Sequence, residues 1–182
     1  PHFLLWPLLI ATAGVEPWAD SKLPGVNGLA AWYDAEAQAK GFASKRWSVP
    51  QAGNGLGQLL DGSGNGQHLA QPKESLRPKL VRLADSWLIR LDGENDHLLR
   101  TTKDAKPSSH ISVFVVLVPH QSPGGFHGPF SLGATDGRDY ETGFNLDLGS
   151  ALGEKFETLN IEGKGMPGER NLLNRSWPLG EA

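Results

Sequence analysis

The sequence predicts an all-β protein, an antiparallel sandwich or barrel made of short strands. Glycine and proline are abundant, with 23 and 13 of the 182 residues, against an average combined usage of about 12%. From Gly28 onward, short apolar runs alternate with clusters of turn residues. After Ala19 no segment keeps a helical period of 3.6 residues over three turns, and the best candidate, residues 31–40, is short.

Length and charge limit the class of protein. A chain of 182 residues is long enough for one domain with a substantial core, and we expect that domain at residues 20–182. The 17 basic and 20 acidic residues give a net charge of −3. The sequence contains no run of Lys or Arg that could follow a phosphate backbone, so nucleic acid is not an expected partner. The apolar fraction of 38% and the six Trp argue against disorder.

Residues 1–19 read as a signal-peptide-like segment and a spacer. The apolar run from Phe3 to Ile10 is followed by Ala11-Thr12-Ala13, the small-x-small pattern that precedes signal cleavage. Cleavage is expected after Ala13, with a second possibility after Ala19. The alternatives are a buried core segment and a membrane span, but a span needs about 20 apolar residues. The segment therefore predicts an exported protein, secreted or in the cell envelope, and the absence of Cys is compatible with this.

The expected strands follow one another along the chain. Residues 40–57 contain several helix and strand breakers without periodicity and are expected to form a long loop. The strongest strand prediction is His110–Pro119, which is β-branched, aromatic and apolar on both faces, as in the centre of a covered sheet. The other predicted strands are residues 29–35, 67–71, 79–84, 86–93, 128–134, 142–149 and 157–163.

The strand predicted at residues 142–149 has two chemically different faces. Phe144, Leu146 and Leu148 alternate with polar residues, so one face is expected to be buried. Asn145 and Asp147 occupy the other face, which is expected to be wet.

The order of several motifs resembles the concanavalin A-like lectin/glucanase superfamily, and most of all the LamG-like jelly-roll modules of exported bacterial proteins of planctomycete type. The motifs are LAAWYDA, DGSGNGQHLAQ, RPKLV, IRLDGENDHL, ISVFVVLVP, FSLGATDGRDYETGFNLDLG and LNIEGKG. The resemblance begins near Leu23 and implies a jelly-roll β-sandwich. Leu59 stands where such modules commonly have Trp, and these modules continue past the residues corresponding to Ala182, so the resemblance implies a truncated module.

Two acidic motifs could be metal sites or turns. In DGSGNG, the residues Asp61, Ser63 and Asn65 have the spacing that begins an EF-hand loop, but the twelfth residue is Pro72 instead of Glu, and strands are expected on both sides. A glycine-rich turn is predicted, in which Asp61 and Asn65 bond nearby backbone amides; a calcium site of another kind is the alternative.

The second acidic motif contains Asp92, Glu94 and Asp96. An extended segment would put the three carboxylates on one face, where a cation could bind. A hairpin would point them apart, and Gly93 and Asn95 favour the hairpin.

The sequence does not predict an enzyme. The glucanases of the superfamily carry their carboxylates as Glu-x-Asp-x-Glu, and here Glu94 and Asp96 begin that pattern, but Leu98 or Leu99 stands in place of the second Glu. No Gly-x-Ser-x-Gly elbow is present, and the six His do not have His-x-x-x-His spacing.

The loop from Gly133 to Gly143 is the predicted ligand-binding site. It carries the polar and aromatic residues Asp136, Arg138, Asp139 and Tyr140, and sugar sites combine carboxylate or guanidinium hydrogen bonds with an aromatic face. A simple Asp-Gly hairpin connection is the alternative.

Three functions remain open at this point. The first is a non-catalytic module of a larger exported bacterial protein that binds carbohydrate or another surface polymer. The second is a structural or protein-interaction spacer without a sugar site, whose partners are neighbouring domains. The third, a glucanase-type hydrolase, rests only on Glu94 and Asp96. No cofactor is expected, apart from the calcium alternative, and no membrane span is expected in the mature chain.

Overall fold

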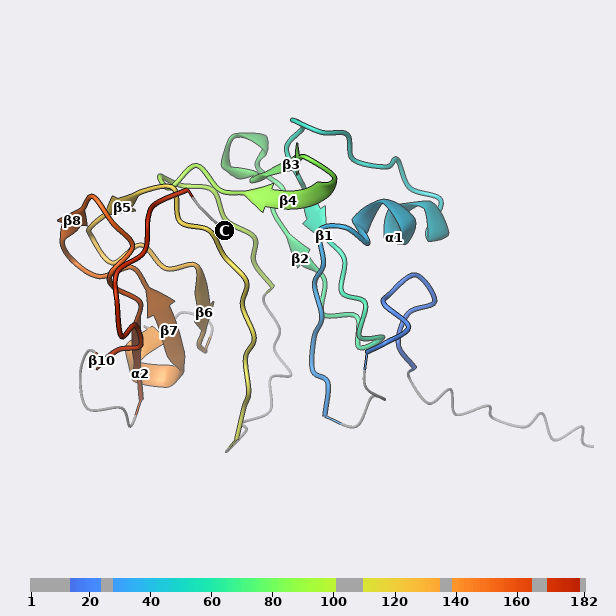
Figure 1. Ribbon diagram of the computed structural model, residues 1–182. Helices are drawn as coiled ribbons and strands as arrows, with labels where there is room; N and C mark the ends of the chain where they lie inside the picture. Colours follow the sequence, from blue (N-terminus) through green and yellow to red (C-terminus); the bar gives the residue numbers. More distant parts are fainter. Residues whose placement is uncertain (1–13, 24–27, 101–109, 135–138, 165–169, 181–182) are drawn as a thin grey trace, which may run out of the picture. The chain divides into compact units, whose positions relative to one another are not determined.

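Figure 1 shows the computed structural model of the protein. It describes residues 14–23, 28–100, 110–134, 139–164 and 170–180. The chain forms two compact units, Pro1–Arg100 and Thr101–Ala182, and each is considered separately. The predicted signal-peptide residues 1–13 lie outside the described part. Residues 14–19, predicted as a spacer, contribute Trp18 to the core of the first unit.

The all-β prediction is confirmed at the level of secondary structure. Every ladder between the strands is antiparallel, and the helices are short. In the first unit the elements are α1 (Gln38–Ser44), β1 (Gln58–Leu59), β2 (Leu69–Ala70), the 3-10 turn η1 (Glu74–Leu76), β3 (Lys79–Leu83) and β4 (Ser86–Arg90). In the second unit they are β5 (Ser122–Pro123), β6 (Phe130–Leu132), α2 (Asp139–Thr142), β7 (Phe144–Asp147), β8 (Leu152–Gly153), β9 (Asn160–Gly163) and β10 (Arg170–Asn171).

The first unit is organised around a small apolar core and two hairpin-like pairs. Strand β1 pairs with β2, and β3 pairs with β4, as the strand predictions at residues 67–71, 79–84 and 86–93 require. The core contains Trp18, Ala37, Phe42, Leu56, Leu59 and Leu60. Leu59, which stands at the aromatic position of the resemblance, is therefore a core residue.

Helix α1 corrects the prediction that residues 40–57 form a loop throughout. It lies at the end of β1 (Figure 1), where Gln38 Nε2 donates to the Leu60 carbonyl oxygen at 3.1 Å and Gln38 Oε1 accepts from Leu60 N–H at 2.8 Å. Gly41 permits this close packing, because a Cβ there would lie 3.0 Å from Leu60 Cδ1. The helix depends on tertiary contacts that a periodicity argument cannot detect.

The strand predicted at residues 29–35 is wrong, because this segment is irregular. Its backbone groups bond to a turn instead of a strand: Trp32 N–H donates to Asp61 Oδ1 at 2.9 Å, and the Trp32 carbonyl oxygen accepts from Gly62 N–H at 2.9 Å. The apolar residues of the segment are thus positioned by a side-chain carboxylate.

The second unit contains a four-stranded antiparallel sheet with the order β10-β9-β7-β6, and α2 packs against β7 and β9. Predicted strands at residues 128–134, 142–149 and 157–163 contain β6, β7 and β9. On one face the rings of Phe130 and Phe144 lie 5.9 Å apart. The expectation that the opposite face is wet is wrong at Asp147, which is fully buried. Its β9 partner Asn160 is also buried, with 3% exposure.

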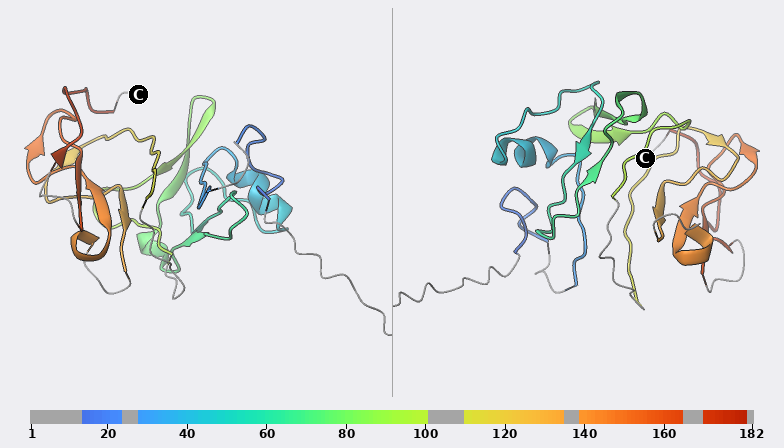
Figure 2. Two further views of the ribbon diagram at one scale, coloured as in Figure 1. Left: turned by 90° about the horizontal axis from the view of Figure 1, so that it is seen from below. Right: turned by 180° about the vertical axis from the view of Figure 1, so that it is seen from behind.

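The strongest strand prediction, His110–Pro119, is also wrong. The segment has no ladder partner in the described part of the chain, and Figure 2 draws it as a plain yellow trace that precedes the short yellow arrow of β5. Phe114 is 94% exposed and Val116 is 100% exposed. Strand propensity is realised only where a neighbouring strand and a covering layer are available, and the described residues supply neither here.

Replacing Phe114 with Ala is therefore expected to change the free energy of unfolding by less than about 0.5 kcal/mol, as for other exposed positions. A Phe in the centre of a buried sheet would cost about 3–5 kcal/mol on the same change. Urea unfolding of the 182-residue chain measures the difference, and Phe42→Ala in the core is the matched control. A loss of several kcal/mol for Phe114→Ala would show that this segment is buried.

Candidate functional site

The DGSGNG segment forms a tight turn around the buried carboxylate of Asp61. Oδ1 accepts hydrogen bonds from Trp32 N–H and Ser63 N–H, both at 2.9 Å. Oδ2 accepts from the Ser63 hydroxyl at 2.7 Å and from Gln67 N–H at 2.8 Å. The predicted turn, with Asp61 bonding nearby backbone amides, is confirmed. All these donors are supplied by the protein, so the arrangement explains the burial of the carboxylate.

The prediction that the Asn65 side chain bonds nearby backbone amides is wrong, because it bonds backbone carbonyl groups of a distant segment. Its Nδ2 group donates to the carbonyl oxygens of Leu29 at 2.7 Å and Ala30 at 3.2 Å. The side chain therefore ties the turn to a segment more than thirty residues earlier. Two glycines of the turn, Gly64 and Gly66, have φ of +85° and +65°, which favours Gly at both positions.

Two titratable side chains, His68 and Tyr33, lie next to this turn. His68 Nδ1 accepts from Asp61 N–H at 2.9 Å, which requires Nδ1 to be unprotonated. Burial, with a contribution from the Lys45 charge, lowers the pKa of His68 below its usual value. Burial and the Asp61 carboxylate raise the pKa of Tyr33 to about 12, and the Tyr33 hydroxyl donates to the Gln67 carbonyl oxygen. Both groups are thus held neutral near pH 7 and have structural partners.

The second acidic motif is also a turn. Asp92 Oδ1 accepts from three backbone N–H groups, Glu94 at 2.9 Å and Asn95 and Asp96 at 3.1 Å. These bonds lower the pKa of Asp92 below its usual value. Asp96 Oδ2 accepts from Asp92 N–H at 3.1 Å. The turn is confirmed, and the carboxylates of Asp92 and Asp96 bond backbone groups of the turn.

The predicted ligand-binding loop lies only partly within the described residues. Asp136 and Arg138 are outside them. Asp139 and Tyr140 begin α2, but their side chains lie outside the described part of the chain, so their roles stay predictions.

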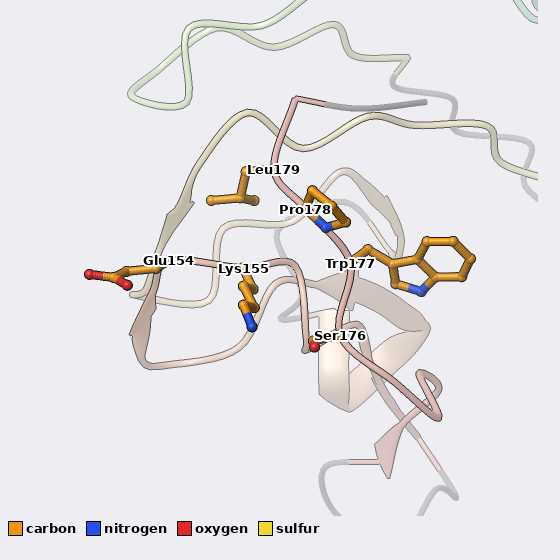
Figure 3. Close-up of a pocket in the computed structure, with 6 residues that line it drawn as sticks. All are labelled: Glu154, Lys155, Ser176, Trp177, Pro178 and Leu179. Atoms are coloured by element: carbon orange, nitrogen blue, oxygen red, sulfur yellow. The ribbon is translucent and has the colours of Figure 1, made fainter.

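The structure shows a hollow that the sequence analysis did not single out. It measures about 370 Å³ and is lined by Glu154, Lys155, Ser176, Trp177, Pro178 and Leu179. Two backbone hydrogen bonds between Phe156 and Trp177, of 2.9 and 2.8 Å, hold its two sides together. Figure 3 shows the Lys155 side chain pointing toward Ser176, while the Trp177 indole projects outward.

Trp177 is the most prominent group of this hollow. Trp177 is 43% exposed, and the Arg175 guanidinium carbon lies 3.8 Å from the ring centroid, a cation–π distance. A single Trp within SWPLG belongs to no periodic pattern or partner motif, so nothing in the sequence distinguishes it from the other five Trp residues.

The chain matches no protein-family model, no curated protein and no solved structure. In the described residues, no group of three or more His, Cys, Asp or Glu side chains is placed to hold a metal ion. The same part of the chain contains no helix with the length and apolarity needed to cross a membrane.

Proposed function

We propose that the chain is a non-catalytic module of a larger exported bacterial protein and that it binds carbohydrate or another surface polymer. The fold proposed with it is a concanavalin A-like, LamG-type β-sandwich, which the motif order and the antiparallel ladders support. The observation that carries the binding proposal is the exposed Trp177 indole at the edge of a polar hollow.

The chemistry of the hollow fits a sugar. An exposed aromatic face accepts the C–H face of a pyranose, and the Arg175 contact holds the indole in place. Lys155 and Ser176 offer hydrogen-bond donors, and Glu154 offers acceptors. The volume of about 370 Å³ lies at the small end of ligand sites, as one or two sugar units of a polymer would require.

The module is proposed to be non-catalytic because its sequence and hydrogen bonds do not supply a pair of catalytic carboxylates. Glycoside hydrolysis needs two carboxyl groups on either side of the sugar bond. Asp96, one of the two candidates, is bonded to the backbone of its own turn, and the family pattern that would add another Glu is interrupted by Leu98 and Leu99.

The spacer function is the second candidate. It is favoured by the two turns around Asp61 and Asp92, since each carboxylate has a complete structural explanation. In that case the partners are neighbouring domains.

A glycan array and pull-downs on insoluble polysaccharides, with the full chain, separate the two. Trp177→Ala is expected to weaken binding at least tenfold. Trp47→Ala is the matched control, because Trp47 is 45% exposed and lies outside the hollow. Tyr140→Ala and Asp139→Ala test the predicted loop in the same assay. Absence of binding by the unmodified chain, with and without calcium, would overturn the proposal and leave the spacer function.

A further inference from the structure

One face of the four-stranded sheet in the second unit is polar and partly buried: Asp147 and Asn160 are buried, and Asn145 and Glu162 are half-buried. Asn145 and Asp147 lie two residues apart in β7, opposite in direction to Phe144 and Leu146. The register of the ladder places Glu162 of β9 directly across from Asn145, and Asn160 directly across from Asp147. Side chains at such cross-strand positions share a face and have Cβ atoms about 4.5–5.5 Å apart. Two carboxylates and two carboxamides are therefore gathered on one side of β7 and β9.

Asp147 is the unusual member of this set. Its side chain is fully buried. Oδ1 accepts from Gly149 N–H at 2.8 Å and from Asn160 Nδ2 at 3.3 Å. Oδ2 is buried too, yet it has no hydrogen-bond partner among the described residues. A buried carboxylate oxygen without a donor is costly, and native proteins rarely leave one in that state.

A second oxygen on the same face shares this condition. Asn145 Oδ1 is buried and lacks a hydrogen-bond partner within the described part of the chain. Asn145 and Asp147 point to the same side of β7, so two unpartnered acceptor oxygens occur together. Each of these two oxygens lacks a hydrogen-bond donor or a positive charge nearby among the described residues. Asp61 differs from them, because the protein supplies all four of its hydrogen bonds.

We propose that this face binds a divalent cation, with Ca²⁺ the preferred ion and Asp147 Oδ2 and Asn145 Oδ1 as ligands. Glu162 lies across from Asn145 on the same face, and Asn160 holds Asp147 Oδ1 through its Nδ2 group. Carboxylate and carboxamide oxygens are the ligands of hard cations, and calcium accepts them in flexible geometry at 2.3–2.6 Å. The four side chains include no thiolate or imidazole of the kind that favours zinc or copper. Water molecules complete the coordination.

The charge of the set indicates a weak site. Only two of the four side chains are carboxylates, and ligand charge is one of the factors that set calcium affinity. A dissociation constant on the order of 10⁻⁴ to 10⁻³ M is expected, the range typical of extracellular modules. This inference does not depend on the proposed sugar-binding function, since none of the four residues lines the hollow at Trp177.

The test is thermal unfolding of the full chain in 10 mM CaCl₂ and in EDTA, with isothermal titration of Ca²⁺ as the direct measurement. A ligand bound only by the folded state raises the melting temperature, and a shift of at least about 5 °C is expected for a unit of this size at 10 mM Ca²⁺. Asp147→Asn keeps the shape of the side chain and removes its charge, so the shift should disappear. Asp92→Asn makes the same change in an exposed turn and should retain the full shift.

A second variant keeps the proposal testable if Asp147→Asn does not fold. Asn145→Asp adds a third carboxylate on the same face and should lower the dissociation constant for Ca²⁺ about tenfold. Mg²⁺ at the same concentration should give a smaller shift, because it requires near-octahedral geometry at short distances. The proposal is overturned if calcium does not shift the melting temperature of the unmodified chain, if Asp147→Asn responds equally, or if Asn145→Asp leaves the affinity unchanged. In those cases bridging water is the better explanation for the two oxygens.

Discussion

Replacing Asp61 with Ala is expected to lower the free energy of unfolding of the first unit by about 4 kcal/mol or more. The carboxylate is fully buried and accepts four hydrogen bonds, three from backbone N–H groups and one from the Ser63 hydroxyl. Each buried donor left without an acceptor costs about 1–3 kcal/mol. Since whole domains are stable by only about 5–15 kcal/mol, the unit should be largely unfolded or close to its transition at 37 °C.

The matched control for Asp61→Ala is Asp92→Ala. Asp92 also accepts three backbone N–H bonds in an Asp-Gly turn, but it is exposed, so water replaces the carboxylate when it is removed. Asp92→Ala is expected to cost about 1 kcal/mol or less. Urea unfolding followed by Trp fluorescence measures both variants. Equal losses of unfolding free energy in the two variants would mean that the turn geometry, and not the burial of Asp61, sets its contribution to stability.

The turns could be predicted from the sequence because their chemistry is local. An Asp that bonds the backbone two residues later needs only its own turn, and this is what Asp61 and Asp92 do. The β3–β4 hairpin is local in the same sense, since its strands are joined by the two residues Ala84 and Asp85. In each case the residues that determine the conformation are neighbours in the chain.

The secondary-structure predictions were wrong where a segment's hydrogen-bonding partner is distant in the sequence. Residues 29–35 have the composition of a strand, yet the groups that bond Trp32 belong to Asp61 and Gly62. Helix α1 depends on Gln38 and Leu60, which are 22 residues apart. Neither contact could be inferred from a window of ten residues, because it depends on which segments meet in space.

The polar face of β7 shows a different limit. Alternation correctly separated Asn145 and Asp147 from the apolar face, but it cannot say whether a polar face is exposed. The burial of Asp147 follows from what covers the sheet, and the orphaned Oδ2 atom is visible only in the structure. The Trp177 hollow has the same origin, since residues 154–155 and 176–179 are brought together by the Phe156–Trp177 bridge.

Replacing Gly143 with Ala is expected to destabilise the second unit by about 3 kcal/mol or more. Gly143 directly precedes β7, and a Cβ atom at this position would lie 1.8 Å from the Leu132 carbonyl oxygen and 2.7 Å from its carbon. These are backbone atoms of β6, so no side chain can rotate away to relieve the overlap. Leu132 pairs with Phe144 in the ladder, and the two strands would have to separate at this end. Overpacking of a rigid site commonly costs 1–3 kcal/mol and occasionally more.

Gly125→Ala is the matched control in the same unit. Gly125 has φ of +67°, so Ala is strained there, but the nearest atom to its Cβ is His127 Cδ2 at 3.6 Å, an ordinary contact. Left-handed backbone costs a non-glycine residue roughly 1–2 kcal/mol, which is the expected loss for this variant. Hydrogen exchange of the β6 and β7 amides gives the local readout, and exchange should accelerate far more in Gly143→Ala than in Gly125→Ala. Similar protection in the two variants would mean that β6 and β7 do not approach each other as closely as the Leu132–Phe144 pairing requires.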